Sequence, residues 1–435
     1  MEFDENRNNR KTSRKKMIII ALIPLIVLSG MLVFLLGPGM SILNIGIPLP
    51  EITIEKIEFQ NDKIVAFIRN TGPEGVDVAQ ADINDRMIPA GIEPSKTLSR
   101  LAEAKVIVPF SWIAGVPYEV GITISDGTRF SKSVEAAALA PTPNVEQASY
   151  FAIIGIYVGV IPVLIGLLWF PFIKRLSMNK YKFFLSLTAG LLVFLGIDAL
   201  VESNAIVAEN IAGAFNGQVL IAMITIITFL VLLYTSEKLV ERAKMKSDDN
   251  TSKSNLVTYS SSPSTTKIPQ KQQQQQQQLA KPFAIAMMIA IGIGLHNFGE
   301  GLAIGAAVLL GEVALSTFLI VGFTLHNTTE GLAIVAPMAK SGGKITIRKL
   351  VIMGLIAGIP TIVGAWIGGF LYSPIAALIF LSIGAGAIFQ VVYSIITWMS
   401  SNTSEPRKAM LSTPMIAGFT VGMVIMYATS LLIPS

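Results

Sequence analysis

The sequence predicts an all-α polytopic membrane bundle, with an eight-span core, an N-terminal anchor helix and an extracytoplasmic β-sandwich domain. Of its 435 residues, 52% are hydrophobic and only 14% are charged, against about 25% charged residues in ordinary soluble domains. The mean hydropathy is +0.62, and apolar runs long enough to cross a bilayer recur along the chain. This composition excludes a soluble cytosolic enzyme, a nucleic-acid-binding factor and a secreted scaffold.

The N-terminus is predicted to be a basic cytoplasmic tail followed by an anchor. Residues 1–16 carry six basic and three acidic side chains, and residues 17–37 form an apolar run. That run is longer than the core of a signal peptide, and no small-residue cleavage site follows it. We therefore expect a transmembrane anchor that stays attached to the mature chain.

Eight further apolar runs are predicted to form the membrane core. Three of them lie within residues 150–235 and five within residues 282–435. Their approximate ranges are 150–173, 183–204, 211–235, 282–309, 314–339, 350–372, 374–399 and 410–433.

Basic residues predict how these spans are oriented. The basic connections are 174–182, 238–281, 340–349 and 407–408, which fall at every second loop. Because cytoplasmic loops are enriched in Lys and Arg, these loops and the N-terminus are expected on the cytoplasmic side. Residues 48–148 and the C-terminus are then expected outside, in a multi-pass protein of the plasma membrane. The net charge of +5 is accordingly attributed to topology, and no nucleic-acid partner is expected.

Two segments outside the spans differ in character. Residues 48–148 contain alternating apolar and polar stretches, such as 52–59, 63–68 and 118–124, separated by turn signals. This pattern is typical of an immunoglobulin-like β-sandwich, for which a spacer or packing role is favoured. Residues 236–281 are rich in Ser, Thr and Lys and include Gln272–Gln278, a composition that predicts a disordered cytoplasmic loop.

A ten-residue motif occurs twice and uses both histidines of the chain. Leu295-His-Asn-Phe-Gly-Glu-Gly-Leu-Ala-Ile304 recurs as Leu325-His-Asn-Thr-Thr-Glu-Gly-Leu-Ala-Ile334, with eight of ten positions identical. His and Glu four residues apart share one helix face, and imidazole nitrogen with carboxylate oxygen suits Zn²⁺ and related ions. A packing role is weaker, since one charged carboxylate at the bilayer centre costs about 3 kcal/mol.

The two motifs are expected at similar depth. His296 lies 15 residues after Lys281, and His326 lies 14 residues before Lys340. At about 1.5 Å per residue, both histidines fall roughly 21–22 Å from those cytoplasmic lysines, near the middle of the membrane. Gly301 and Gly331 directly follow the two glutamates and permit close helix approach. The metal-site candidates are His296, Asn297, Glu300, His326, Asn327 and Glu330.

At these residues the chain resembles the ZIP (Zrt/Irt-like) family of divalent metal transporters over about 150–435. The resemblance implies entry of Zn²⁺, and often Fe²⁺ or Mn²⁺, towards the cytoplasm as substrate rather than cofactor. It also implies a homodimer in the lipid bilayer and an elevator-like movement of one helix group. Departures from the family pattern are Asn327, where a carboxylate is common, and Thr361, where glutamate is common. They favour one principal metal site over two.

Further polar residues in the predicted spans are candidates for the transport pathway. Asp198 and Glu202 lie four residues apart near the outer end of 183–204, and Gln390 lies in 374–399. Buried carboxylates in membranes tend to line ion routes, although an interfacial Glu202 with only Asp198 buried would also fit the sequence.

Two other function classes remain as alternatives. An intramembrane zinc-dependent hydrolase would use bound Zn²⁺ to activate water, but the chain has two histidines and no HExxH pattern. A metal-responsive receptor would depend on residues 48–148, which show no ligand-like cluster. No cysteine is present, which excludes thiolate sites, and Gly342-Gly-Lys344 lacks P-loop spacing. We expect a transporter and no enzymatic activity.

Overall fold

The structure is a computed structural model that describes most of the chain from Leu49 onward. The described residues are 26, 29–30, 49–140, 143–210, 216–259, 270–310, 313–340, 345–401, 405, 408 and 410–431. The predicted tail 1–16 and nearly all of the predicted anchor 17–37 lie outside these residues.

The first part of the described chain is rich in β-structure and forms two open antiparallel sheets. One sheet has the order β1-β2-β7-β5, and the other has the order β4-β3-β8-β9 with β6 paired to β3. The strands are β1 Ile52–Gln60, β2 Lys63–Asn70, β3 Val76–Ile83, β4 Arg86–Ile88, β5 Gly91–Glu93, β6 Thr97–Leu98, β7 Glu103–Pro109, β8 Tyr118–Ile124 and β9 Arg129–Val134. The three strands predicted from alternation lie within β1, β2 and β8.

One hydrophobic core draws on both sheets. Ile64 and Val106 from the first sheet and Val120 and Ile122 from the second are fully buried in the same cluster. Alternation with a period of two is clearest in β7, where Ala104, Val106 and Val108 are buried and the residues between them are more exposed. An ion pair at the sheet surface joins Arg129 Nη2 to Asp82 Oδ1 at 2.6 Å.

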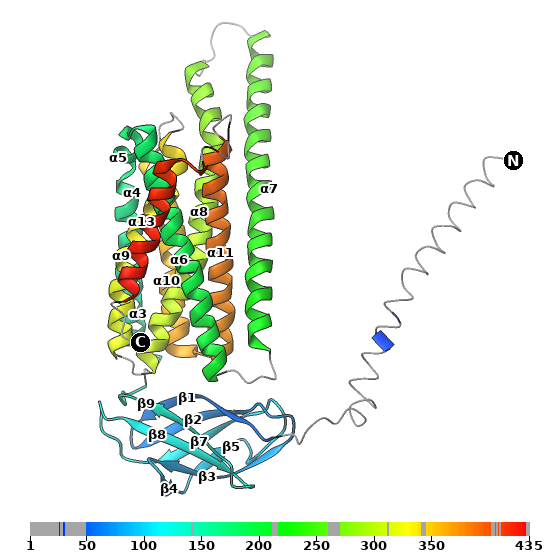
Figure 1. Cartoon of the computed structure of the whole chain (residues 1–435), viewed down its shortest axis with the longest axis vertical. Helices are drawn as coiled ribbons and strands as arrows, with labels where there is room; N and C mark the ends of the chain where they lie inside the picture. The colour runs from blue at the N-terminus through cyan, green and yellow to red at the C-terminus, as the bar shows by residue number, and fades with distance from the viewer. Residues whose placement is uncertain are drawn as a thin grey trace, which may run out of the picture. The chain divides into compact units, whose positions relative to one another are not determined.

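The rest of the described chain is helical (Figure 1). The helices are α3 Val145–Gly155, α4 Ile161–Leu168, α5 Phe170–Arg175, α6 Met178–Asn210, α7 Gly217–Tyr259, α8 Gln270–Leu309, α9 Val313–Ala339, α10 Ile347–Leu371, α11 Pro374–Ser401 and α13 Thr413–Ser430. Within the described residues, seven helical stretches are long and apolar enough to cross a membrane. The chain is therefore a multi-pass membrane protein. The predicted run 410–433 corresponds to α13, whose apolar part Thr413–Ala428 is shorter than the other seven.

The first predicted span, 150–173, is not one regular helix. A π-helical turn η1, Ile156–Val160, separates α3 from α4, and the Ile161 N–H donates to Ile156 O, five residues back. Pro162 lacks the N–H that would bond the Val158 carbonyl four residues earlier in an α-helix. The Val158 carbonyl can therefore accept a hydrogen bond from a partner outside its own helix. Single π-turns of this kind are frequent at functional sites.

Glycines bring the motif helices into backbone contact with their neighbours. A Cβ on Gly301 of α8 would lie 2.1 Å from Thr361 O of α10, and one on Gly364 would lie 2.1 Å from Phe298 O. Gly331 of α9 faces Gly166 of α4 in the same way, because a Cβ on Gly331 would lie 2.8 Å from the Cα of Gly166. The expectation that Gly301 and Gly331 allow close helix approach is confirmed.

The segment predicted to be a disordered loop, 236–281, differs from that expectation where it is described. Residues 236–259 continue α7, and residues 270–281 begin α8, while 260–269 lie outside the described residues. Glu, Lys and Gln are good helix formers, and extending a formed helix requires no new nucleus. Helical continuation of the two membrane helices therefore does not need an apolar core.

Candidate metal centre

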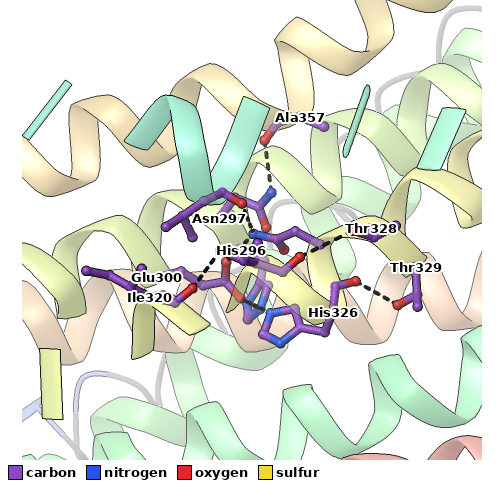
Figure 2. Close-up of polar contacts among 11 residues, drawn as sticks. His296, Asn297, Glu300, Ile320, His326, Thr328, Thr329 and Ala357 are labelled. Atoms are coloured by element: carbon purple, nitrogen blue, oxygen red, sulfur yellow. Dashed lines mark hydrogen bonds and ion pairs between the residues drawn. The ribbon is translucent and has the colours of Figure 1, made fainter. Parts of the chain in front are cut away.

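The two copies of the motif lie on neighbouring helices and their polar side chains meet in the interior. His296, Asn297 and Glu300 belong to α8, while His326, Asn327 and Glu330 belong to α9. All six side chains are buried. The sequence places His and Glu one turn apart on each helix, and the packing of α8 against α9 brings the two faces together (Figure 2).

Glu300 is the centre of the cluster. Its Oε1 accepts a hydrogen bond from His326 Nε2 across the helix interface and lies 3.2 Å from His296 Nε2 on its own helix. The three residues offer ligand atoms that all lie within 4.8 Å of one another. Two imidazole nitrogens and one carboxylate oxygen thus converge from two helices, and they come from three of the six candidate residues.

Asn327 fixes the second oxygen of Glu300. Its Nδ2 donates to Glu300 Oε2 at 3.0 Å and to the Val158 carbonyl of η1 at 3.0 Å. Both amide hydrogens are therefore used, one on the carboxylate and one on the carbonyl that the π-turn makes available. The side chain links the first span to the cluster, and Glu300 Oε1 is left to face the two histidines.

Asn297 is held in a related way on the other helix. Its Nδ2 donates to the Ala357 carbonyl of α10 at 3.1 Å (Figure 2). For both asparagines the buried Oδ1 finds no hydrogen-bond partner among the described residues. A buried carbonyl oxygen without a partner is costly, so both amides offer an oxygen suited to a cation.

Glu330 is the most unusual member of the group. It is 1% exposed, and within the described part of the chain neither of its carboxylate oxygens has a hydrogen-bond partner. Its carboxylate lies close enough to Glu300, His296 and His326 for electrostatic interaction, although its oxygens are not in the three-residue cluster. Removing a carboxylate from water costs several kcal/mol without a counter-charge, so this position fits a bound cation.

The other candidate pathway residues occupy different positions. Asp198 on α6 and Glu202, one turn further along the same helix, are both exposed, and Asp198 lies close enough to His326 and His296 for electrostatic interaction. Gln390 on α11 is fully buried, donates to Ser394 Oγ at 2.8 Å, and has an unpartnered Oε1 in the described structure. A Cβ on Gly292, four residues before His296, would lie 3.8 Å from that oxygen.

Sequence reasoning did not identify two of the groups that shape this site. They are the backbone carbonyls of Val158 and Ala357, which hold the two asparagine amides. In the sequence, Pro162 is the feature that could have identified the Val158 carbonyl, because proline has no N–H to donate to the carbonyl four residues earlier. Thr361 stands buried at the α8–α10 contact without a hydrogen-bond partner for Oγ1 among the described residues, and Gly159 closely approaches that oxygen.

The donor set fits a first-row divalent ion with a small adjustment. Tetrahedral Zn²⁺ with bonds of about 2.0–2.1 Å separates its ligand atoms by roughly 3.3 Å. The contact between His296 Nε2 and Glu300 Oε1, at 3.2 Å, already has that spacing. The His326–Glu300 contact is closer than that spacing and has to open when an ion binds.

Comparison with known proteins assigns no family. No protein-family model matches the chain, and no curated protein matches it either.

Proposed function

We propose that this protein is a membrane transporter that carries divalent metal cations, Zn²⁺ foremost and also Fe²⁺ or Mn²⁺, towards the cytoplasm. The observation that carries the proposal is the convergence of His296, Glu300 and His326 inside a bundle of membrane helices. Ionisable residues buried at membrane depth mark ion pathways in general. The resemblance of the duplicated motif to ZIP transporters agrees with it.

Charge balance supports a divalent substrate. Two neutral imidazoles and the carboxylates of Glu300 and Glu330 carry a combined charge of −2, which one divalent cation neutralises. In this proposal His296, Glu300 and His326 bind the ion directly, Glu330 supplies the second negative charge, and Asn297 offers an amide oxygen. The set contains no thiolate, so the ion is held by ligands that also allow release.

The position of the cluster between helix groups supports movement of the ion. α8 and α10 pack through glycines, as do α4 and α9, while Gly190, Gly418 and Gly422 join α6 to α13. His296 lies at the boundary, because a Cβ on Gly384 of α11 would be 3.4 Å from its Nδ1. An elevator-like shift of the motif helices against α6, α7, α11 and α13 would expose the site to one side at a time.

The finer architecture belongs to the same proposal. We infer an immunoglobulin-like sandwich from the two sheets, and eight core spans preceded by the anchor 17–37. The N-terminus is cytoplasmic, residues 48–148 and the C-terminus are outside, and the membrane is the plasma membrane. An impermeant thiol reagent applied to intact cells should label Ser95→Cys and leave Ser262→Cys unlabelled. The reverse labelling would invert the orientation and the direction of transport.

Uptake into vesicles tests the function itself. Purified protein is reconstituted into liposomes that contain a zinc-sensitive dye, and Zn²⁺ is added outside. We expect saturable entry that empty liposomes do not show, with competition by Fe²⁺ and Mn²⁺. Zinc binding without entry, accompanied by hydrolysis of a peptide or ester in the membrane, would instead identify the zinc-dependent hydrolase.

A further inference from the structure

The loop between β7 and β8 presents an apolar tip that the β-rich domain does not cover. Its sequence, Phe110-Ser-Trp-Ile-Ala-Gly-Val-Pro117, contains no charged residue. Ile113 is 67% exposed and Val116 is 36% exposed, and Leu139 next to them is 58% exposed. Single exposed apolar residues are ordinary on protein surfaces, but here three large ones gather at one end of the domain.

The exposed tip is held in a defined conformation. Trp112 Nε1 donates to the Gln60 carbonyl at 2.7 Å, and the Ile113 N–H donates to the Tyr118 hydroxyl at 3.0 Å. The Phe59 ring lies edge-on to Trp112, with ring centroids 5.1 Å apart. The loop therefore keeps its indole half-buried while the side chains that follow it point outward.

The same loop is bonded to the segment that leads into the membrane. The Gly115 N–H donates to Ala137 O at 2.8 Å, and the Ala137 N–H donates to Val116 O at 3.0 Å. Ala140 is then fixed by its N–H to Phe59 O at 2.8 Å, and the next apolar helix long enough to cross a membrane begins at Val145. Five residues extend at most about 17 Å, so the loop cannot lie far from the bilayer surface.

We propose that the loop Phe110–Pro117, together with Leu139, inserts into the outer headgroup layer of the bilayer. The partner is the lipid surface, because the short tether keeps the tip near it and an uncharged tip with Trp and Ile fits the interface. Asp62, whose carbonyl accepts from the Phe110 N–H, borders the loop and stays in water, which limits the depth. This inference rests on the membrane topology and not on metal transport.

The loops at the opposite end of the domain have a different composition. The turns around Pro94–Lys96 and Ser125–Thr128 carry Glu93, Lys96 and Asp126, and no large hydrophobic residue within those two turns is among the exposed ones. The turn around Ser95 therefore supplies an internal reference on the same domain, while the exposed Asp85, in the turn that bonds the Glu119 N–H, lies on the same side of the domain as the apolar loop.

Nitroxide accessibility in the full-length protein tests the proposal. The chain has no cysteine, so Ile113→Cys and Ala114→Cys can each be spin-labelled singly, with Ser95→Cys as the control. In phosphatidylcholine vesicles, labels at 113 and 114 should collide with dissolved oxygen and be shielded from a water-soluble nickel complex. The ratio of oxygen to nickel accessibility should be several-fold higher than at 95.

Two results would overturn it. If the labels at 113 and 114 meet the nickel complex as freely as the label at 95, the loop lies in water. If they are shielded from both reagents, the loop contacts protein, either this chain or a second copy. Using two neighbouring exposed positions guards against a folding defect at one of them.

Discussion

Asn327 of α9 donates a 3.0 Å hydrogen bond to Glu300 of α8, and so joins the two copies of the repeated motif. The same amide holds the Val158 carbonyl, so three segments meet at one side chain. This contact orients the carboxylate that both histidines approach. Partners of this kind set the geometry of metal ligands and matter nearly as much as the ligands.

Replacing this amide should weaken metal binding, because it removes the hydrogen bond that orients the carboxylate of Glu300. We expect Asn327→Leu to lower Zn²⁺ affinity about 10–100-fold, measured by competition with a chromophoric chelator. Thr225→Val on α7 is the matched control, because the buried Thr225 hydroxyl also donates to a backbone carbonyl, that of Ser382, and is not among the residues of the metal site. An equal loss of affinity in the two variants would show that the bond to Glu300 has no special role.

Glu300 itself should be indispensable for binding. Glu300→Gln keeps the size of the side chain and removes its charge, so we expect Zn²⁺ affinity to fall by more than about 100-fold. Glu146→Gln, in the exposed first turn of α3, should leave affinity unchanged. Isothermal titration of purified protein measures both, and parent-like affinity in Glu300→Gln would remove this residue from the site.

The glycine contact between α8 and α10 should be sensitive to a single methyl group. Gly301→Ala places a Cβ 2.1 Å from Thr361 O, and relieving that overlap should cost about 1–3 kcal/mol of unfolding free energy. Gly322→Ala on α9 meets nothing within 4 Å and should be neutral or slightly stabilising, because alanine favours helix. Thermal unfolding in detergent distinguishes the two, and similar melting temperatures would contradict the packing described here.

Asp198 should affect capture of the ion rather than its passage. Its carboxylate interacts with both histidines, and local negative potential raises the on-rate of cations. We expect Asp198→Asn to raise the KM for Zn²⁺ uptake with little change in the maximal rate. Glu202→Gln, one turn away, should have the smaller effect. An unchanged KM in Asp198→Asn would leave this residue outside the pathway.

Local patterns predicted the elements and the residues of the cluster, but not the contacts that orient them. The four-residue spacing of the motif places His296 and Glu300 on one face of α8, and the repeat places His326 at the matching position of α9. Hydropathy located the seven apolar stretches. Asn297 and Asn327 each donate to a backbone carbonyl more than 50 residues away in sequence, and such a carbonyl carries no side-chain signal. The π-turn at Ile156–Val160 was not predicted, because hydropathy does not show which backbone N–H donates to which carbonyl.

Positions outside the spans were less predictable for a related reason. The continuation of α7 through 236–259 and of α8 through 270–281 depends on helix propagation from the membrane segments, which composition does not show. The alternation in 52–59 and 118–124 predicted strands correctly, because one face of each strand is buried in a core that both sheets share. The order of the strands within the sheets depends on non-local pairing and could not be read from that alternation.

The initial rate of Zn²⁺ entry into dye-loaded proteoliposomes, compared between the parent and His326→Ala, shows whether ions cross the membrane through the buried cluster. We expect saturable entry in the parent and in Glu146→Gln. In His326→Ala we expect the rate to fall to that of empty vesicles although the protein is still folded and inserted. Parent-like Zn²⁺ entry in His326→Ala would show that the buried cluster is a packing feature and that the ion does not cross through it.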